Sequence, residues 1–121
     1  MWVIYNPNRR GKKASDCVIR AITKALGISW DAAFWLLAAT AYDEGDMPSI
    51  NSTWGVLLEK HGFRRALPDR RMSVREFCAE HPSGIYVLAT GTHVVTEIDG
   101  CWYDAWNSAD ETVAYYFEED D

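Results

Sequence analysis

The chain lacks the features that would place it in a membrane or in an oxidising compartment. No apolar run in its 121 residues approaches the roughly 20 residues that a membrane-spanning helix needs. The apolar start at residues 1–5 is followed at once by Asn6-Pro7 and is too short for a signal peptide. Cysteine is scarce, with three residues and no Cys-x-x-Cys pair, which argues against a disulfide framework. We therefore expect a cytoplasmic protein with reduced thiols and no membrane partner.

Positive charge is also in short supply. The formal net charge is −6, which argues against nucleic acid as a partner. The charge is uneven along the chain, because six basic residues against one acidic residue give residues 1–24 a charge of +5. The remaining residues, 25–121, therefore carry −11. Such an asymmetry suits a surface that binds another protein.

The patterns that are present predict one domain over residues 1–121 with helices first and strands after. Helical patterns cover residues 17–26, 30–42, 51–61 and 73–80. After Pro82, strand patterns cover residues 85–89, 93–98, 101–105 and 112–117. Without βαβ alternation, this order predicts an α+β fold in which N-terminal helices pack on a C-terminal antiparallel sheet.

Three smaller expectations concern single segments. Residues 2–5 are predicted to form a short edge strand, and residues 63–72 a basic connection. Residues 30–42 are apolar nearly all round, which predicts a central, buried helix.

A cysteine stands where the first helix is predicted to begin. Ser15 or Asp16 is expected to cap this helix, so that Cys17 lies in its first turn. The positive end of the helix dipole favours a thiolate there, and the thiolate is the nucleophilic form of cysteine. The alternative is a small buried core residue, which is the commoner fate of a lone cysteine. Cys78 and Cys101 carry only that second interpretation.

A tight turn is predicted at Asp99-Gly100. These two residues lie between two β-rich runs, which is a strong signal for a hairpin with a type I′ turn. The turn sets the register of the hairpin, since Ile98 then pairs with Cys101 and the flanking residues pair in step. Side chains alternate between the two faces of a sheet, so this register decides which residues share a face.

The predicted register brings a histidine and an aspartate together. His93 and Asp104 are diagonal neighbours on one face, about 7–8 Å apart at the backbone, within reach of two side chains that lean together. Trp106 stands opposite His93, where it can shield the pair from water. Asn107 points to the other face, so Asp104 is the better partner for the imidazole.

A cysteine, a histidine and an aspartate in these positions predict nucleophilic catalysis. His93 would take the thiol proton of Cys17, and Asp104 would orient the imidazole. Asp16 opposes thiolate formation and Arg20 offsets it, unless Arg20 is a structural ion-pair residue. The same residue types could bind zinc, but no paired-ligand spacing supports a metal site. We expect neither a metal nor another cofactor.

Short motifs follow one another along nearly the whole chain. They are Tyr5-Asn6-Pro7-Asn8, Asp16-Cys17-Val18-Ile19-Arg20-Ala21, Gly45-Asp46-Met47-Pro48-Ser49, Asn51, Trp54-Gly55, His61-Gly62-Phe63, His81-Pro82, Gly91-Thr92-His93-Val94-Val95, Asp99-Gly100 and Tyr103-Asp104-Ala105-Trp106. Their order and spacing resemble a family of small papain-like cysteine peptidases of bacteriophages and of gut bacteria that carry phage genes. The resemblance implies a papain-like fold, similar to bacteriocin-leader peptidase domains, with Cys17 on a helical half and His93 and Asp104 on a sheet.

The resemblance also implies a side chain that stabilises the oxyanion. Papain-like enzymes often use a glutamine a few residues before the cysteine, and this chain contains no glutamine. Asn6 or Asn8 in the preceding loop is the candidate donor, together with the backbone amide of Cys17.

Three functions remain open at this point. The first is hydrolysis of a peptide or isopeptide bond in a protein substrate, in a phage-infected or bacterial host cell. The second is deamidation of a side-chain amide by the same three residues. The third is a non-catalytic papain-like module that blocks a host protein. The sequence leaves the oligomeric state undetermined.

Overall fold

A six-stranded sheet forms the centre of the structure, a computed structural model that describes residues 1–120. In chain order the strands are β1 (Trp2–Ile4), β2 (Phe63–Ala66), β3 (Ile85–Ala89), β4 (Val94–Ile98), β5 (Cys101–Asp104) and β6 (Tyr115–Glu119). Across the sheet their order is β1-β5-β4-β3-β6-β2. The described helices are α1 (Cys17–Leu26), α2 (Trp30–Glu44), α3 (Asn51–Lys60) and α4 (Val74–Glu80). The predicted α+β class is confirmed.

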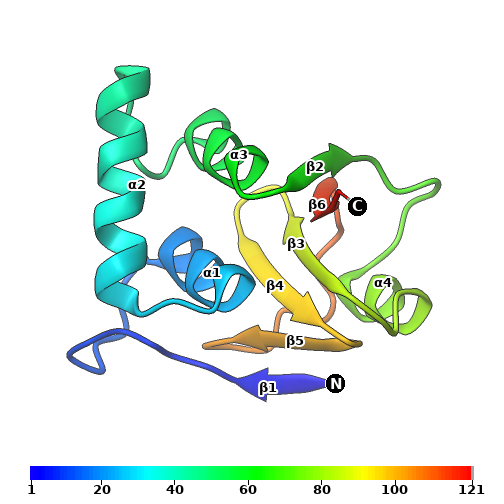
Figure 1. Cartoon of the computed structure of the whole chain (residues 1–121). Coiled ribbons are helices and arrows are strands. Elements are labelled where there is room, and N and C mark those ends of the chain that lie inside the picture. The colour runs from blue at the N-terminus through cyan, green and yellow to red at the C-terminus, as the bar shows by residue number, and fades with distance from the viewer. Residues whose placement is uncertain (121) are drawn as a thin grey trace.

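The helices cover both faces of the sheet (Figure 1). α1 packs on β4, and α2 lies outside α1, on the side away from the sheet. Alternate residues of β3 divide the interior into two cores. Val87 and Ala89 belong to the core that α1, α2 and α3 cover. Leu88 belongs to the other core, together with Phe77 and Cys78 of α4.

α1 buries the apolar stripe that its sequence predicts. Ala21, Ile22 and Ala25 are buried against the sheet and the neighbouring helices. The helix ends at Gly27, whose φ of +65° lies in the left-handed region that glycine adopts without strain. This packing places the first residue of α1, Cys17, close to the start of β4.

α2 is not the central, buried helix that the composition of residues 30–42 predicts. It buries only one stripe, which includes Ala33 and Leu37, because only that side contacts α1 and α3. On the outer side Trp35 is 69% exposed and Tyr42 is 86% exposed. No helix in the described part of the chain is long and apolar enough to cross a membrane.

The sheet is mixed, which corrects the predicted antiparallel arrangement. β1 is an edge strand as predicted, but it runs parallel to β5, with Trp2 opposite Trp102. The sequence predicts a connection over 63–72, whereas its first four residues form β2 and pair with β6. β6 also begins later than the predicted strand 112–117. These pairings join segments that are distant in sequence, so no local turn signal marks them.

The hairpin of β4 and β5 has the predicted turn and register. Asp99 has a φ of +51° and Gly100 a φ of +86°, as a type I′ turn requires at both central positions. Ile98 pairs with Cys101, and the next two pairs follow in step. The Asp99 carboxylate accepts a hydrogen bond from the backbone N–H of Gly84, which ties the turn to the start of β3.

Candidate active site

Cys17 is the first residue of α1, as predicted, and its side chain is half-buried. Asp16 precedes the helix, but its carboxylate does not cap the helix amides. It accepts hydrogen bonds instead from Arg20 Nη1 and from Trp30 Nε1, each at 2.9 Å. The negative charge beside the thiol is therefore paired with a guanidinium.

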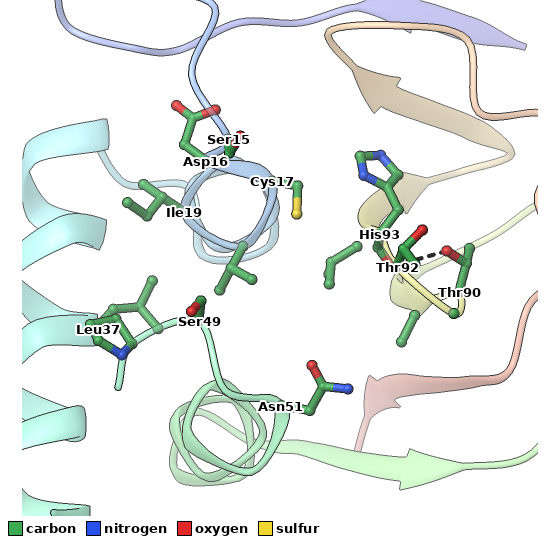
Figure 2. A pocket seen from close by; sticks show the side chains of 15 residues that line it. Ser15, Asp16, Cys17, Ile19, Leu37, Ser49, Asn51, Thr90, Thr92 and His93 are labelled. Carbon is green, nitrogen blue, oxygen red and sulfur yellow. Dashed lines mark hydrogen bonds between the residues drawn. The ribbon is translucent and has the colours of Figure 1, made fainter. Parts of the chain in front are cut away.

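His93 lies directly before β4, next to the N-terminus of α1. Figure 2 shows Cys17 and His93 lining the same pocket from the helix and from the strand end. The imidazole Nε2 is 2.6 Å from Asp104 Oδ2. Nδ1 is therefore the ring nitrogen that remains for the sulfur of Cys17. The predicted contact between His93 and Asp104 is present.

Asp104 ends β5 with its side chain fully buried and fully hydrogen-bonded. Besides the contact with His93, its carboxylate accepts a bond from Ser108 Oγ at 2.7 Å and from Arg20 Nη2 at 3.0 Å. The backbone N–H of Ala105 donates a fourth bond at 2.8 Å. Four hydrogen-bond donors fix the orientation of the carboxylate and offset the free-energy cost of removing it from water.

Trp106 and Asn107, the second and third residues after Asp104, lie as the hairpin register predicts. The ring of Trp106 lies 4.6 Å from the ring of His93, and Trp106 is 46% exposed. It therefore covers one side of the imidazole and leaves the indole itself partly in solvent. Asn107 accepts a hydrogen bond from Trp102 Nε1 at 3.3 Å and does not partner the histidine.

Electrostatics favour the charged forms of the cysteine and the histidine. Burial raises the pKa of Cys17, but the hydrogen bond and charge of His93, the amide of Val94 and the charge of Arg20 lower it below its usual value. Burial lowers the pKa of His93, but its bonds to Asp104 and Cys17 raise it to about 9. Both directions favour the charged forms, a thiolate beside an imidazolium.

The aspartate stays ionised for a similar reason. Burial raises the pKa of Asp104, but the hydrogen bonds from His93 and Ser108 and the charge of Arg20 hold it below its usual value. A carboxylate, rather than a carboxylic acid, therefore faces the imidazole and stabilises its positive charge.

Arg20 joins the start of α1 to the end of β5. Its guanidinium is buried and bridges Asp16 and Asp104, at 2.9 Å and 3.0 Å. Of the two interpretations open from the sequence, the structural ion pair is present, and Arg20 also lowers the pKa of Cys17. One cation thus pairs with both buried carboxylates and also acts on the thiol of Cys17.

The two asparagines of the preceding loop differ in position. The amide nitrogen of Asn8 donates to Asp16 at 3.3 Å, and its oxygen accepts from two backbone amides of the loop. The amide nitrogen of Asn6 donates to the Lys12 carbonyl at 3.4 Å, but Asn6, unlike Asn8, lines a cavity beside Cys17 and His93. Of the two predicted oxyanion donors, Asn6 is therefore the better placed.

Two cavities meet at the thiol. Residues that line both are Ser15, Asp16, Cys17, Thr92 and His93. The first cavity, of about 290 Å³, has polar residues such as Ser49 and Asn51 in its lining (Figure 2). Its apolar lining residues are Val18, Ile19, Leu37, Pro48, Ala89 and Val94. The second, about 450 Å³, is more polar and includes Asn6, Lys13 and Trp106. An extended ligand that occupied both cavities would pass over the sulfur.

Sequence reasoning missed two supporting residues, Ser108 and Trp30. Ser108 lies in the irregular segment after β5, where no periodic pattern indicates which side chains point inward. Trp30 begins α2, and the sequence pattern counts it as an apolar residue, so it does not indicate that its indole N–H donates to Asp16. Neither position carries a local signal for its partner.

Within residues 1–120, no group of three or more histidine, cysteine, aspartate or glutamate side chains is placed to hold a metal ion. The thiol of Cys17 contacts the imidazole of His93, and the imidazole contacts the carboxylate of Asp104. The three groups therefore form a chain of contacts and do not surround a common point where a metal ion could bind. This arrangement suits proton transfer and nucleophilic attack.

Comparisons with known proteins found no relative of this chain. No protein-family model, curated protein or solved structure matches it. A function is therefore inferred from the geometry of the site and from the motifs of the sequence.

Proposed function

We propose that this protein is a papain-like cysteine hydrolase that cleaves a peptide or amide bond in a polypeptide. One observation carries the proposal: Cys17, His93 and Asp104 form a connected thiol–imidazole–carboxylate chain, in which the pKa of the thiol is lowered and that of the imidazole is raised. A cysteine at the start of a helix that packs on a sheet bearing the histidine and aspartate also matches what the sequence resemblance implies.

The proposed reaction begins with the Cys17 thiolate. Its sulfur attacks the carbonyl carbon of the substrate, and the carbonyl π electrons move to the oxygen. Asn6 and the backbone N–H of Cys17 stabilise that oxyanion. When the intermediate collapses, the C–N bond breaks, and the imidazolium of His93 protonates the leaving amine. The acyl group remains on Cys17 as a thioester.

Hydrolysis of the thioester completes the cycle. Neutral His93 accepts a proton from water, and the resulting hydroxide attacks the thioester carbonyl. Collapse of the second tetrahedral intermediate releases the carboxylic acid and restores the thiolate–imidazolium pair. Asp104 stabilises the imidazolium in both halves of the cycle and keeps Nδ1 directed at the sulfur.

The test is hydrolysis of a random peptide mixture by the purified protein, followed by mass spectrometry. We expect new peptide ends with the wild type and none with Cys17→Ser. Conversion of a side-chain amide to a carboxyl group, in which an intact peptide takes up water and releases ammonia, would assign the deamidation reaction to the same residues. Hydrolysis that persists in Cys17→Ser would contradict the proposal.

His93→Ala and Tyr42→Ala provide a matched pair of further variants. His93→Ala removes the proton carrier, so the rate should fall by at least about a hundredfold. Tyr42 is exposed on α2, away from both cavities, so its replacement should leave the rate unchanged. Equal effects of the two substitutions would exclude His93 from the reaction.

A further inference from the structure

A third cavity, of about 410 Å³, lies on the far side of the loop that precedes α1. We call it the basic–aromatic hollow. Its walls are the loop and the first turns of α2, and its lining residues are Asn8, Arg9, Arg10, Lys12, Ala14, Trp30, Asp31, Phe34 and Trp35. None of the three catalytic candidates lines it.

The loop wall of the hollow is positively charged. Arg9, Arg10 and Lys12 line it, whereas Asp31 is the single acidic lining residue. Asp31 lies 3.8 Å from Arg9, and both side chains are more than half exposed, so this pair neutralises little of the local charge. The hollow is thus a basic site on a chain whose net charge is −6.

The α2 wall of the hollow is aromatic and open to solvent. Trp30 stacks on Phe34 with 5.3 Å between ring centroids, and Trp35 meets Phe34 edge to face at 5.3 Å. Phe34 is 39% exposed, and Trp35 is the most exposed of the three. A connected patch of exposed aromatic rings beside a cavity is typical of a surface that binds another molecule.

The hollow adjoins the candidate active site. Ala14 lines both the hollow and the polar cavity beside Cys17. Trp30, in the wall of the hollow, also donates its indole N–H to Asp16, the residue before the thiol. A polypeptide lying in the polar cavity could therefore continue directly over the loop into the hollow.

We propose that the basic–aromatic hollow binds a short substrate segment that combines acidic with aromatic or large aliphatic side chains. This inference rests on the proposed function for the cleavage itself, but not for the binding. Carboxylates would pair with Arg9, Arg10 and Lys12, while an apolar side chain would pack on Phe34 and Trp35. A nucleic-acid strand is the poorer occupant, because residues 25–121, the larger part of the molecule, carry a net charge of −11 that repels phosphates.

The test is selection from a random library of twelve-residue peptides on the full-length Cys17→Ala protein, which binds peptide without cleaving it. A parallel selection uses the same protein with Arg10→Glu and Trp35→Ala added. Peptides enriched only in the first selection are those that need the hollow. We expect that set to be rich in aspartate or glutamate and in phenylalanine, tryptophan or leucine.

Binding of the most enriched peptide is then measured by fluorescence anisotropy. Arg10→Glu and Trp35→Ala, made singly in Cys17→Ala, should each weaken it by about tenfold. Arg71→Glu and Tyr42→Ala are matched controls, since both residues are exposed and lie outside the hollow. These controls should leave the affinity unchanged, and added salt should weaken binding to the parent protein.

Several results would overturn the inference. One is that no peptide is enriched only in the first selection, and another is that the peptides enriched there contain no acidic residues. A third is that the control variants lose as much peptide affinity as Arg10→Glu and Trp35→Ala do. Binding of an oligothymidylate probe, or self-association of the protein, that is lost in the same two variants while no peptide set emerges would assign the hollow to another occupant. Hydrolysis by the wild type together with an empty set would refute only the hollow. A hollow-dependent set without hydrolysis would refute only the proposed function.

Discussion

Two regions of this molecule each contain a cysteine and a buried carboxyl group, but the pKa values of these groups shift in opposite directions. At the candidate active site, the pKa of Cys17 and that of Asp104 lie below their usual values, although burial by itself raises both. In the core beneath α4, burial raises the pKa of Cys78 strongly and that of Glu97 to about 8. Burial raises the pKa of the cysteine and of the carboxyl group in both regions, so burial by itself does not distinguish them.

The difference is a cation in direct contact with the titratable group. His93 and Arg20 face the thiol and the carboxylate at the active site. In the other region, Glu97 Oε2 accepts a bond from the Gly100 N–H, while no partner for Oε1 is found in the described chain. Glu97 also raises the pKa of Cys78 further. The N-terminal ammonium lowers the pKa of both groups, but by less than burial raises it. A cation in contact with a buried thiol thus activates it, whereas burial without such a contact keeps the thiol inert.

Removal of Arg20, the cation that both carboxylates share, should produce the largest change at the active site. Arg20→Met should leave Asp16 and Asp104 buried without a guanidinium, and unfolding by urea should show a loss of about 3–5 kcal/mol. Arg20→Lys restores the charge without the two-pronged geometry and should recover part of the loss. The labelling of Cys17 should shift to higher pH in both variants. Unchanged stability in Arg20→Met would mean that the ion pairs contribute nothing.

The reactivities of the thiols provide the next test. Iodoacetamide near neutral pH should alkylate Cys17 more than about a hundredfold faster than Cys78, because only the thiolate reacts. His93→Ala should slow the labelling of Cys17 by at least about tenfold and leave Cys78 unaffected. Peptide mass spectrometry at timed intervals measures each site. Similar slow labelling of all three cysteines would remove the contrast between the regions.

Glu97 makes the pH dependence of stability a third test. Its folded pKa is raised, so its contribution to stability is present below its ordinary pKa near 4.5 and is lost as the pH rises toward about 8. Glu97→Gln cannot ionise. The free energy of unfolding of the variant relative to the wild type should therefore increase by about 3 kcal/mol between pH 5 and pH 8.

The comparison between variant and wild type is needed because His93 adds a slope of its own. Its pKa is raised to about 9, so it stabilises the fold below its ordinary value of 6.5 and less as the pH rises through 9. That slope is common to both proteins and cancels in the difference. A pH-independent difference would show that Glu97 is ionised in the folded protein throughout.

The smallest expected effect concerns the hydroxyl behind the aspartate. Ser108→Ala removes one of the four donors to Asp104 and should cost about 1 kcal/mol in urea unfolding. The alkylation rate of Cys17 should fall by about threefold, because the imidazolium is then less well stabilised. Ser83→Ala, at an exposed serine away from both cavities, should change neither quantity. An equal loss in both variants would show that the hydroxyl of Ser108 has no special part.

Local chemistry in the sequence was sufficient to predict the pairing of the histidine. A two-residue Asp99-Gly100 turn restricts the backbone to positive φ, and the strict alternation of strands then determines which residues share a face. The contact between His93 and Asp104 follows from that register. The start of the helix at Cys17 is likewise encoded within a few residues, by the change from a polar loop to an apolar stripe.

Tertiary structure decided what lies beyond the reach of turns and periodicity. Arg20 and Asp104 are 84 positions apart, and only the packing of α1 on the sheet makes one guanidinium serve both carboxylates. The packing also left an aromatic side of α2 in solvent, although its composition predicted burial, because the neighbouring helices cover a single stripe. Whether an apolar or charged side chain is buried depends on the surface that it meets, and distant segments supply that surface.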